Sequence, residues 1–215
     1  MNADAAIVYL VDDDASYLTS ISRLLKASGL AVKAFGSARE FLDALEIGAP
    51  GCVIADLRMP GMNGLELQAA LAKCGAAHPV IFLTGDGDIP ASVQAMRNGA
   101  EDFLEKCAPK KDLLDAVQRA LARDAGERAR REHQRELRTR FSALTERELE
   151  VLGHVVQGKL NKQIAADLGI HERTVKLHRT AITTKLRAPS VAEITRLVQD
   201  AGLFSGGTFS FPKGQ

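Results

Sequence analysis

The feature that most constrains the fold is a repeat in the first 122 residues, where short apolar runs alternate with segments whose apolar residues recur three and four positions apart. The first pattern predicts β-strands and the second predicts amphipathic helices. Strands are predicted at 6–11, 30–35, 52–57, 80–84 and 101–106, and helices at 16–28, 39–45, 64–73, 89–99 and 112–122. Five consecutive βα units predict an α/β domain with a doubly wound parallel sheet that has helices on both faces.

A different pattern begins near residue 123. Residues 123–141 (RDAGERARREHQRELRTRF) have many charges and few large apolar residues, which predicts a charged helical linker weakened at Gly126. Coiled-coil pairing is disfavoured because sustained apolar heptads are missing. Helical spacing returns at 145–158, 161–169, 172–186 and 190–202, with no strand signal. We expect a first domain at 1–122, an all-α second domain at 142–204 and a flexible tail at 205–215.

Composition excludes several classes of protein. Hydrophobic residues make up 46% and charged residues 26% of the chain, a balance typical of soluble globular proteins. No run approaches the roughly 20 apolar residues of a membrane span, and Asp4 without a basic leader argues against a secretory signal, so we expect a cytoplasmic protein without a membrane partner. Cys52, Cys74 and Cys107 lack a CxxC spacing, which argues against disulfides and structural zinc.

Charge is distributed unevenly between the two halves. Residues 1–122 hold 11 Lys and Arg against 16 Asp and Glu, a net charge of −5, whereas residues 123–215 hold 17 against 11, a net charge of +6. A basic second half is compatible with polyanion binding. The signal is weak by itself, because half of the excess lies in the linker.

Acidic residues stand at the carboxyl ends of two predicted strands. Asp12 and Asp13 follow the first and Asp56 ends the third, while Thr84 ends the fourth and Lys106 ends the fifth. These ends meet at one edge of a parallel sheet, and carboxylates gathered there need a compensating cation such as Mg²⁺. With a metal and a lysine beside it, Asp56 could be a nucleophile toward a phosphoryl group. The alternative is that each residue only caps a loop or helix.

Residues 6 to about 122 resemble the receiver domain of two-component response regulators. The resemblance rests on VDDD, the DLRMPGMNGLEL block, TGDGDIP and FLEK. It implies a flavodoxin-like fold, in which Pro60, Gly61 and Gly64 shape the turn after the third strand. It also implies specific roles: Asp56 as phosphoacceptor, Asp12 and Asp13 as Mg²⁺ ligands together with Asp56 and the backbone carbonyl of Arg58, Thr84 as switch hydroxyl and Phe103 as switch aromatic. Lys106 would supply a fixed positive charge where a phosphoryl oxygen could lie.

One position departs from that pattern. Receivers usually carry Lys-Pro at the end of the fifth strand, with a cis peptide bond, whereas this chain has Lys106-Cys107. A cis bond before a residue other than proline costs about 2.5–4 kcal/mol, so the bond is expected to be trans or unusually constrained. A thiol beside a lysine can have a lowered pKa, which raises a secondary hypothesis that Cys107 senses oxidants.

The segment NKQIAADLGIHERTVKLHRTAITTKL has the layout of two helices joined by a tight turn at 168–170. Its expected core consists of Ile164, Ala165, Leu168, Val175, Ile182 and Leu186. This layout suits a helix-turn-helix whose second helix enters the DNA major groove. Base contacts are expected from Arg173, Thr174, Lys176, Leu177, Thr180 and Thr184, and phosphate contacts from Arg179, Lys185, Asn161 and Lys162. A helical dimerisation or docking bundle is the alternative.

Residues 142 to about 200 resemble the LuxR-type helix-turn-helix of FixJ- and NarL-like regulators, through LTERELEVLGHVVQG, NKQIAADLGI and RTVKLHRTAITTKL. His171 stands where that family usually has a capping Ser, and Ala181 stands where Asn is common. A His caps a helix less well than Ser, by about 1 kcal/mol.

Together the two resemblances predict a response regulator rather than an enzyme. A sensor histidine kinase would phosphorylate Asp56 with Mg²⁺, and the phosphorylated chain would form a homodimer through the fourth helix, fifth strand and fifth helix. The dimer would bind double-stranded DNA, with RNA polymerase as a further partner. Three alternatives are a phosphorylation-independent DNA-binding regulator, a hydrolase that uses Asp56, and an adaptor whose basic helices dock another protein.

Overall fold

The computed structural model describes residues 6–85, 89–205 and 208–209. The chain divides into two compact units, with the boundary between Arg128 and Ala129. The first unit alternates strands and helices, as the repeat predicts. Its elements are β1 (Ile7–Val11), α1 (Ala15–Ala27), β2 (Ala31–Phe35), α2 (Ala38–Ala44), β3 (Gly51–Asp56), α3 (Gly64–Lys73), β4 (Val80–Thr84), α4 (Ile89–Arg97), β5 (Asp102–Glu105) and the beginning of α5 (Lys110–Ser142).

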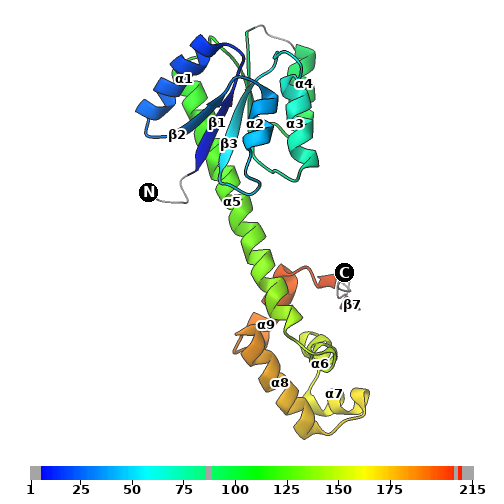
Figure 1. Cartoon of the computed structure of the whole chain (residues 1–215). Helices are drawn as coiled ribbons and strands as arrows, with labels where there is room; N and C mark the ends of the chain where they lie inside the picture. The colour runs from blue at the N-terminus through cyan, green and yellow to red at the C-terminus, as the bar shows by residue number, and fades with distance from the viewer. Residues whose placement is uncertain (1–5, 86–88, 206–207, 210–215) are drawn as a thin grey trace. The chain divides into compact units, whose positions relative to one another are not determined.

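The five strands form one parallel sheet in the order β2-β1-β3-β4-β5 (Figure 1). The predicted five-stranded, doubly wound sheet is therefore confirmed. The chain moves outward from β1 to β2 and then returns to the other side of β1 for β3. This reversal places the switch in strand order between β1 and β3, where the carboxyl ends of the strands leave room for a site.

Side chains of each strand alternate between two hydrophobic layers, because neighbouring strand residues point to opposite faces. Tyr9 and Val11 of β1 belong to the layer that includes residues of α2, α3 and α4. Val8 and Leu10 belong to the layer that includes residues of α1 and α5. Every residue of β3 and β4 is buried, which explains their continuous apolar runs.

Polar side chains fix the starts of the helices that lead away from the site. Asp14 caps α1 by accepting the backbone N–H groups of Ser16 and Tyr17. Asn63 and Glu66 form a capping box at the start of α3. Gly64 follows directly, and a Cβ there would lie 2.5 Å from the carbonyl oxygen of Asp56 and 2.9 Å from the Phe82 ring. Glycine is therefore required for α3 to begin this close to β3.

A buried carboxylate joins α5 to the start of β3, at the end of the sheet away from Asp56. Asp124 is buried, and its Oδ2 accepts the backbone N–H of Gly51 at 3.0 Å. Arg123 pairs with Glu101 at 3.2 Å on the surface nearby. The first unit thus includes a part of α5 that the sequence analysis assigns to a charged linker.

The second unit is helical around one core, and it contains the end of α5 followed by α6 (Glu146–Val156), α7 (Asn161–Leu168), α8 (Glu172–Leu186) and α9 (Val191–Asp200). Of the predicted core residues, Ile164, Val175, Ile182 and Leu186 are fully buried, and Ala165 and Leu168 pack against them partly buried. Gly169 ends α7 in the left-handed conformation, with φ of +63°, and so makes the predicted tight turn.

The structure differs from the sequence prediction near the end of the chain, where no strand was expected. Two short antiparallel strands, β6 (Phe204–Ser205) and β7 (Thr208–Phe209), pair with each other. Strands of two residues are too short for hydrophobic periodicity to reveal.

Candidate functional site

Three carboxylates gather at the switch in strand order. Asp12 follows β1 and Asp56 ends β3, and one oxygen from each of Asp12, Asp13 and Asp56 lies within 4.8 Å of the others. Asp12 and Asp56 are buried, whereas Asp13 is exposed. Hard oxygen ligands this close together suit a divalent cation that keeps some of its water. The exposed carboxylate leaves such a cation open to solvent on one side.

Lys106 occupies the space between the two buried carboxylates. Its Nζ lies 2.7 Å from Asp12 Oδ2 and 3.1 Å from Asp56 Oδ2. Burial opposes the charge of Lys106, but its hydrogen bonds to Asp12 and Asp56 outweigh burial and raise its pKa. Burial is also the main cause that raises the pKa of Asp12, against the bonds from Lys106 and Asp14. The site therefore holds a charged lysine beside a buried carboxylate, that of Asp12, whose charge Lys106 does not fully compensate.

Thr84 and Phe103 lie on the two successive strands beyond β3, the strand that carries Asp56. Thr84 ends β4 and is buried, one residue beyond Leu83, which pairs in register with Asp56. Phe103 lies in β5, partly buried, with its ring centroid 6.2 Å from that of Phe82. Their assignment as switch residues stays a prediction. Residues 86–88 of the TGDGDIP motif lie outside the described residues.

Arg58 stands in the loop between β3 and α3, with its side chain exposed. Together with Asp13 and Pro60 it lines a hollow beside the carboxylates. The proposed use of its backbone carbonyl as a metal ligand stays a prediction.

Cys107 does not have the environment of an activated thiol. The peptide bond between Lys106 and Cys107 is trans, and the Cys107 thiol donates a hydrogen bond to Glu105 Oε2 at 3.3 Å. This bond to a carboxylate raises the pKa of Cys107 above its ordinary value. A raised pKa lowers the fraction of reactive thiolate, so the geometry disfavours the redox hypothesis.

Helix α8 presents a polar surface opposite the core. Arg173, Lys176, Leu177, Thr180 and Thr184 are all exposed, and Leu177 leaves 65% of its surface in solvent. The hydroxyl groups of Thr180 and Thr184 donate to backbone carbonyls one turn earlier. This leaves the methyl groups of these exposed residues available for apolar contacts with DNA. A surface that combines cations with exposed apolar groups suits the edges of DNA bases.

The predicted phosphate-binding residues differ in exposure. Lys162 is exposed, while Asn161, Arg179 and Lys185 are half-buried, as is Thr174 in the base-contact group. His171 begins α8 without a side-chain capping bond, in keeping with its weaker capping ability. Lys185 Nζ lies 2.7 Å from the buried carboxylate of Glu148, a contact that the sequence analysis missed. The TERE sequence at 145–148 is a capping-box signature that could have located Glu148.

Comparison with known proteins identifies both units. Residues 8–118 match the response regulator receiver domain, and residues 142–198 match the LuxR family of bacterial regulatory proteins. The chain is 44% identical to nodulation protein W of Bradyrhizobium diazoefficiens over 206 residues, which cover 94% of this chain and 89% of that one. It is 43% identical to the transcriptional regulatory protein FixJ of Azorhizobium caulinodans over 199 residues, which cover 91% and 93%.

This chain belongs to the FixJ/NarL-type response regulators. Among solved structures, the response regulator StyR superposes with a TM-score of 0.86 at 42% identity, covering 91% of this chain and 98% of that one. Full-length FixJ from B. japonicum gives a TM-score of 0.58 at 34% identity, covering 93% and 98%.

As a response regulator with a LuxR-type helix-turn-helix, the protein is a DNA-binding regulator of transcription in a two-component system. The predicted family, and with it the predicted DNA-binding regulator, is confirmed. Receiver domains bind Mg²⁺ through acidic residues, and Asp12, Asp13 and Asp56 form such a set. Within the described part of the chain, no helix is long and apolar enough to cross a membrane.

Proposed function

We propose that a histidine kinase transfers a phosphoryl group to Asp56, and that this transfer switches dimerisation and sequence-specific DNA binding. The observation that carries the proposal is the position of Lys106, whose ammonium lies 3.1 Å from Asp56 Oδ2 and 2.7 Å from Asp12 Oδ2. A phosphoryl group accepted by Asp56 brings negative charge to the point where this ammonium lies. Positioning and charge neutralisation are most of what phosphoryl transfer requires.

The transfer replaces one bond to phosphorus by another. A carboxylate oxygen of Asp56 attacks phosphorus, the bond to the imidazole nitrogen of the kinase breaks, and the imidazole leaves with the electron pair. Lys106 and the Thr84 hydroxyl stabilise the phosphoryl oxygens. Asp12, Asp13, Asp56 and the carbonyl of Arg58 would hold Mg²⁺, which would offset the charge of the carboxylates and the phosphoryl group.

The test is phosphorylation of the full chain by acetyl phosphate with Mg²⁺. We expect one phosphoryl group on the wild type, seen by intact mass and by retardation on a phosphate-affinity gel, and none on Asp56→Asn. Asp43→Asn, an exposed carboxylate on α2, is the matched control and should accept phosphate normally. Phosphorylation of Asp56→Asn at the wild-type level would contradict the proposal.

We further propose that Thr84 and Phe103 transmit phosphorylation to the surface formed by α4, β5 and α5, where a second copy binds. Exposed apolar side chains on α4 support this surface, with Val93 at 45% and Met96 at 48% exposure. Met96→Glu should reduce the dimer fraction of the phosphorylated chain in sedimentation experiments. An unchanged dimer fraction would reject this surface.

The DNA-binding proposal places α8 in the major groove, with half-sites arranged by the homodimer and RNA polymerase as a further partner. It assigns base contacts to Arg173, Thr174, Lys176, Leu177, Thr180 and Thr184, and phosphate contacts to Asn161, Lys162, Arg179 and Lys185. The proposed division is a receiver at 1–122, a linker at 123–141 and a DNA-binding domain at 142–204. The exposure of Leu177 supports this use of α8, since burial in the fold does not explain its apolar side chain.

Selection of DNA from a random pool, with and without acetyl phosphate, identifies the site and tests the switch. On the selected site, Leu177→Ala should weaken binding by about 5- to 20-fold, the effect of losing a specific base contact. Lys176→Ala should also weaken binding, whereas Lys73→Ala, at an exposed lysine in the last turn of α3, serves as control. Equal affinity with and without phosphorylation would favour the phosphorylation-independent alternative.

A further inference from the structure

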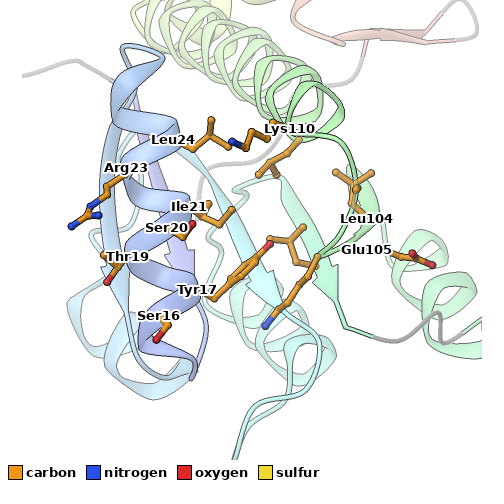
Figure 2. Close-up of a pocket in the computed structure, with 14 residues that line it drawn as sticks. Ser16, Tyr17, Thr19, Ser20, Ile21, Arg23, Leu24, Leu104, Glu105 and Lys110 are labelled. Carbon is orange, nitrogen blue, oxygen red and sulfur yellow. The ribbon is translucent and has the colours of Figure 1, made fainter.

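The ring of Tyr17 lies against the active-site lysine. Lys106 Nζ is 4.6 Å from the centroid of the Tyr17 ring, a distance typical of a cation–π interaction. Tyr17 belongs to the first turn of α1 and projects into a hollow of about 650 Å³ that α1 forms with β5 and the start of α5 (Figure 2). The proposed phosphoryl transfer assigns no role to this aromatic side chain.

We propose that Tyr17 is a positioning residue, whose ring holds the Lys106 ammonium at the carboxylate of Asp56. The inference rests on the proposed function, because it concerns the lysine that would meet the phosphoryl group.

The backbone of Tyr17 is tied to the carboxylates that surround Lys106. Asp12 Oδ1 accepts the backbone N–H of Asp14 at 2.9 Å. Asp14 Oδ1 in turn accepts the backbone N–H of Tyr17 at 3.1 Å. The ring of Tyr17 then contacts Lys106, whose ammonium returns to Asp12 at 2.7 Å. These contacts tie the backbone from which the ring projects to the same buried carboxylate that binds the ammonium.

Lys106 needs such support because its side chain has four rotatable bonds and a partly exposed head. Its backbone is held by the N–H bond to the carbonyl of Thr84 at 2.7 Å, but this bond does not orient the ammonium. Asp12 and Asp56 attract the ammonium in the structure, but Asp12 would bind the cation and Asp56 would carry the phosphoryl group during the reaction. The Tyr17 ring binds neither of these groups, so it can keep its contact with Lys106 throughout.

The ring also remains uncharged. Burial is the main cause that raises the pKa of the Tyr17 hydroxyl, and the nearby Lys106 only partly opposes it. A neutral ring attracts a cation through its face without competing for its proton. Phenylalanine offers the same face, so the two aromatic residues should be interchangeable here and an aliphatic residue should not replace them.

The first experiment compares rates of phosphorylation by acetyl phosphate with saturating Mg²⁺ in the full chain. Tyr17→Leu should be slower than the wild type by about fivefold, as expected for loss of a partly desolvated cation–π contact, whereas Tyr17→Phe should stay within about twofold. Ser20→Ala is the matched control, because Ser20 lies one turn further along α1 and lines the same hollow. Tyr17→Leu should still unfold in one cooperative thermal transition, and its Mg²⁺ affinity should be unchanged.

A second measurement reads the contact without any phosphorylation. A ring face shifts the ε-methylene protons of a nearby lysine upfield in an NMR spectrum. The upfield signal, assigned to Lys106 by its loss in Lys106→Ala, should persist in Tyr17→Phe and disappear in Tyr17→Leu.

A wild-type rate in Tyr17→Leu, or an equal loss of rate in both variants, would overturn the positioning role. If the wild type accepted no phosphoryl group, the proposed function would fail instead. The Lys106 signal would then decide the inference separately: an unshifted signal in the wild type would overturn it, and a shift that depends on the ring would support it.

Discussion

The ammonium of Lys185 on α8 lies 3.0 Å and 2.7 Å from the two carboxylate oxygens of Glu148 on α6. Glu148 is buried, and it also accepts the backbone N–H of Thr145 at 2.7 Å. Burial by itself would raise the pKa of Glu148, but the bonds from Lys185 and Thr145 outweigh it and lower the pKa. This pair therefore joins the helix before the helix-turn-helix to its second helix.

Removing the lysine should destabilise the second unit. Lys185→Met leaves the Glu148 carboxylate buried without its charged donor, and we expect the free energy of unfolding to fall by about 1–2 kcal/mol, discounted for the partial exposure of Lys185. Urea denaturation at pH 7 measures the change. Lys162→Met, at an exposed cation on α7, should cost less than about 0.5 kcal/mol. A similar loss in both variants would contradict a special role for the pair.

The same pair should make stability depend on acid pH. The pKa of Glu148 is lower in the folded chain than in the unfolded chain, where it is about 4.3. Its stabilisation is therefore complete above that value and is lost as the pH falls through the folded pKa. Denaturation curves between neutral pH and pH 3 should show a smaller acid-induced loss for Lys185→Met than for the wild type. Identical acid slopes would show that Glu148 does not contribute.

Magnesium should stabilise the first unit through its carboxylate cluster. Ligand binding to the folded state raises stability as its concentration exceeds the dissociation constant, so the melting temperature should rise with Mg²⁺ concentration. Asp13→Asn should remove most of this rise without lowering the melting temperature in metal-free buffer, because Asp13 is exposed. Asp43→Asn should respond like the wild type. An equal rise with Na⁺ at matched ionic strength would indicate only screening.

Two glycines should respond to alanine with opposite signs. Gly64→Ala puts a Cβ 2.5 Å from the carbonyl oxygen of Asp56, and it should destabilise the chain by about 1–3 kcal/mol and slow phosphorylation by displacing Asp56. Gly126 lies within α5 with open space around it, so Gly126→Ala should stabilise by about 0.5–1 kcal/mol. Denaturant unfolding measures both changes. A neutral Gly64→Ala would show that α3 can retreat from β3.

Cys107 should behave as an ordinary exposed thiol. Its bond to Glu105 raises its pKa, so it should be oxidised by mild peroxide no faster than Cys74, which is also exposed and free. Peptide mass spectrometry after a time course of peroxide measures the two rates. Cys107→Ser should also leave the rate of phosphorylation unchanged. Selective oxidation of Cys107 would restore the redox hypothesis.

Local patterns were sufficient to predict most of the first unit. Buried strands such as β3 and β4 appear in the sequence as continuous apolar runs, and parallel strand ends must meet at one edge, so the proximity of Asp12, Asp13 and Asp56 could be anticipated. The placement of Lys106 was less certain, because Cys107 follows it in place of proline. In the structure the lysine is nevertheless in place: its backbone N–H donates to the carbonyl of Thr84, and its ammonium pairs with Asp12 and Asp56.

Contacts between distant segments could not be predicted in this way. Tyr17 reaches Lys106 because the start of α1 and the end of β5 both lie at the edge of the sheet where the carboxyl ends of the strands meet, although 89 positions separate the two residues. Glu148 and Lys185 are 37 positions apart. The sequence alone equally suggests a helix-capping role for Glu148 and a phosphate contact for Lys185, so it does not reveal their pairing. The charged segment 123–141 was easier, because its composition predicts a helix, and it continues α5 without interruption to Ser142. Helix propensity and the buried Asp124 outweigh the single unfavourable Gly126.

The bond from the Gly51 backbone to Asp124 sets a limit on how the protein can be dissected. A polypeptide ending at residue 122 would lose the acceptor of the Gly51 N–H group, which is buried in the intact chain at the start of the strand that carries Asp56. Fragments meant to represent the signalling half should therefore retain the chain through Arg128. The same bond has a second consequence: a displacement of α5 at Asp124 would act on Gly51, the first residue of β3, and Asp56 is the last residue of that strand.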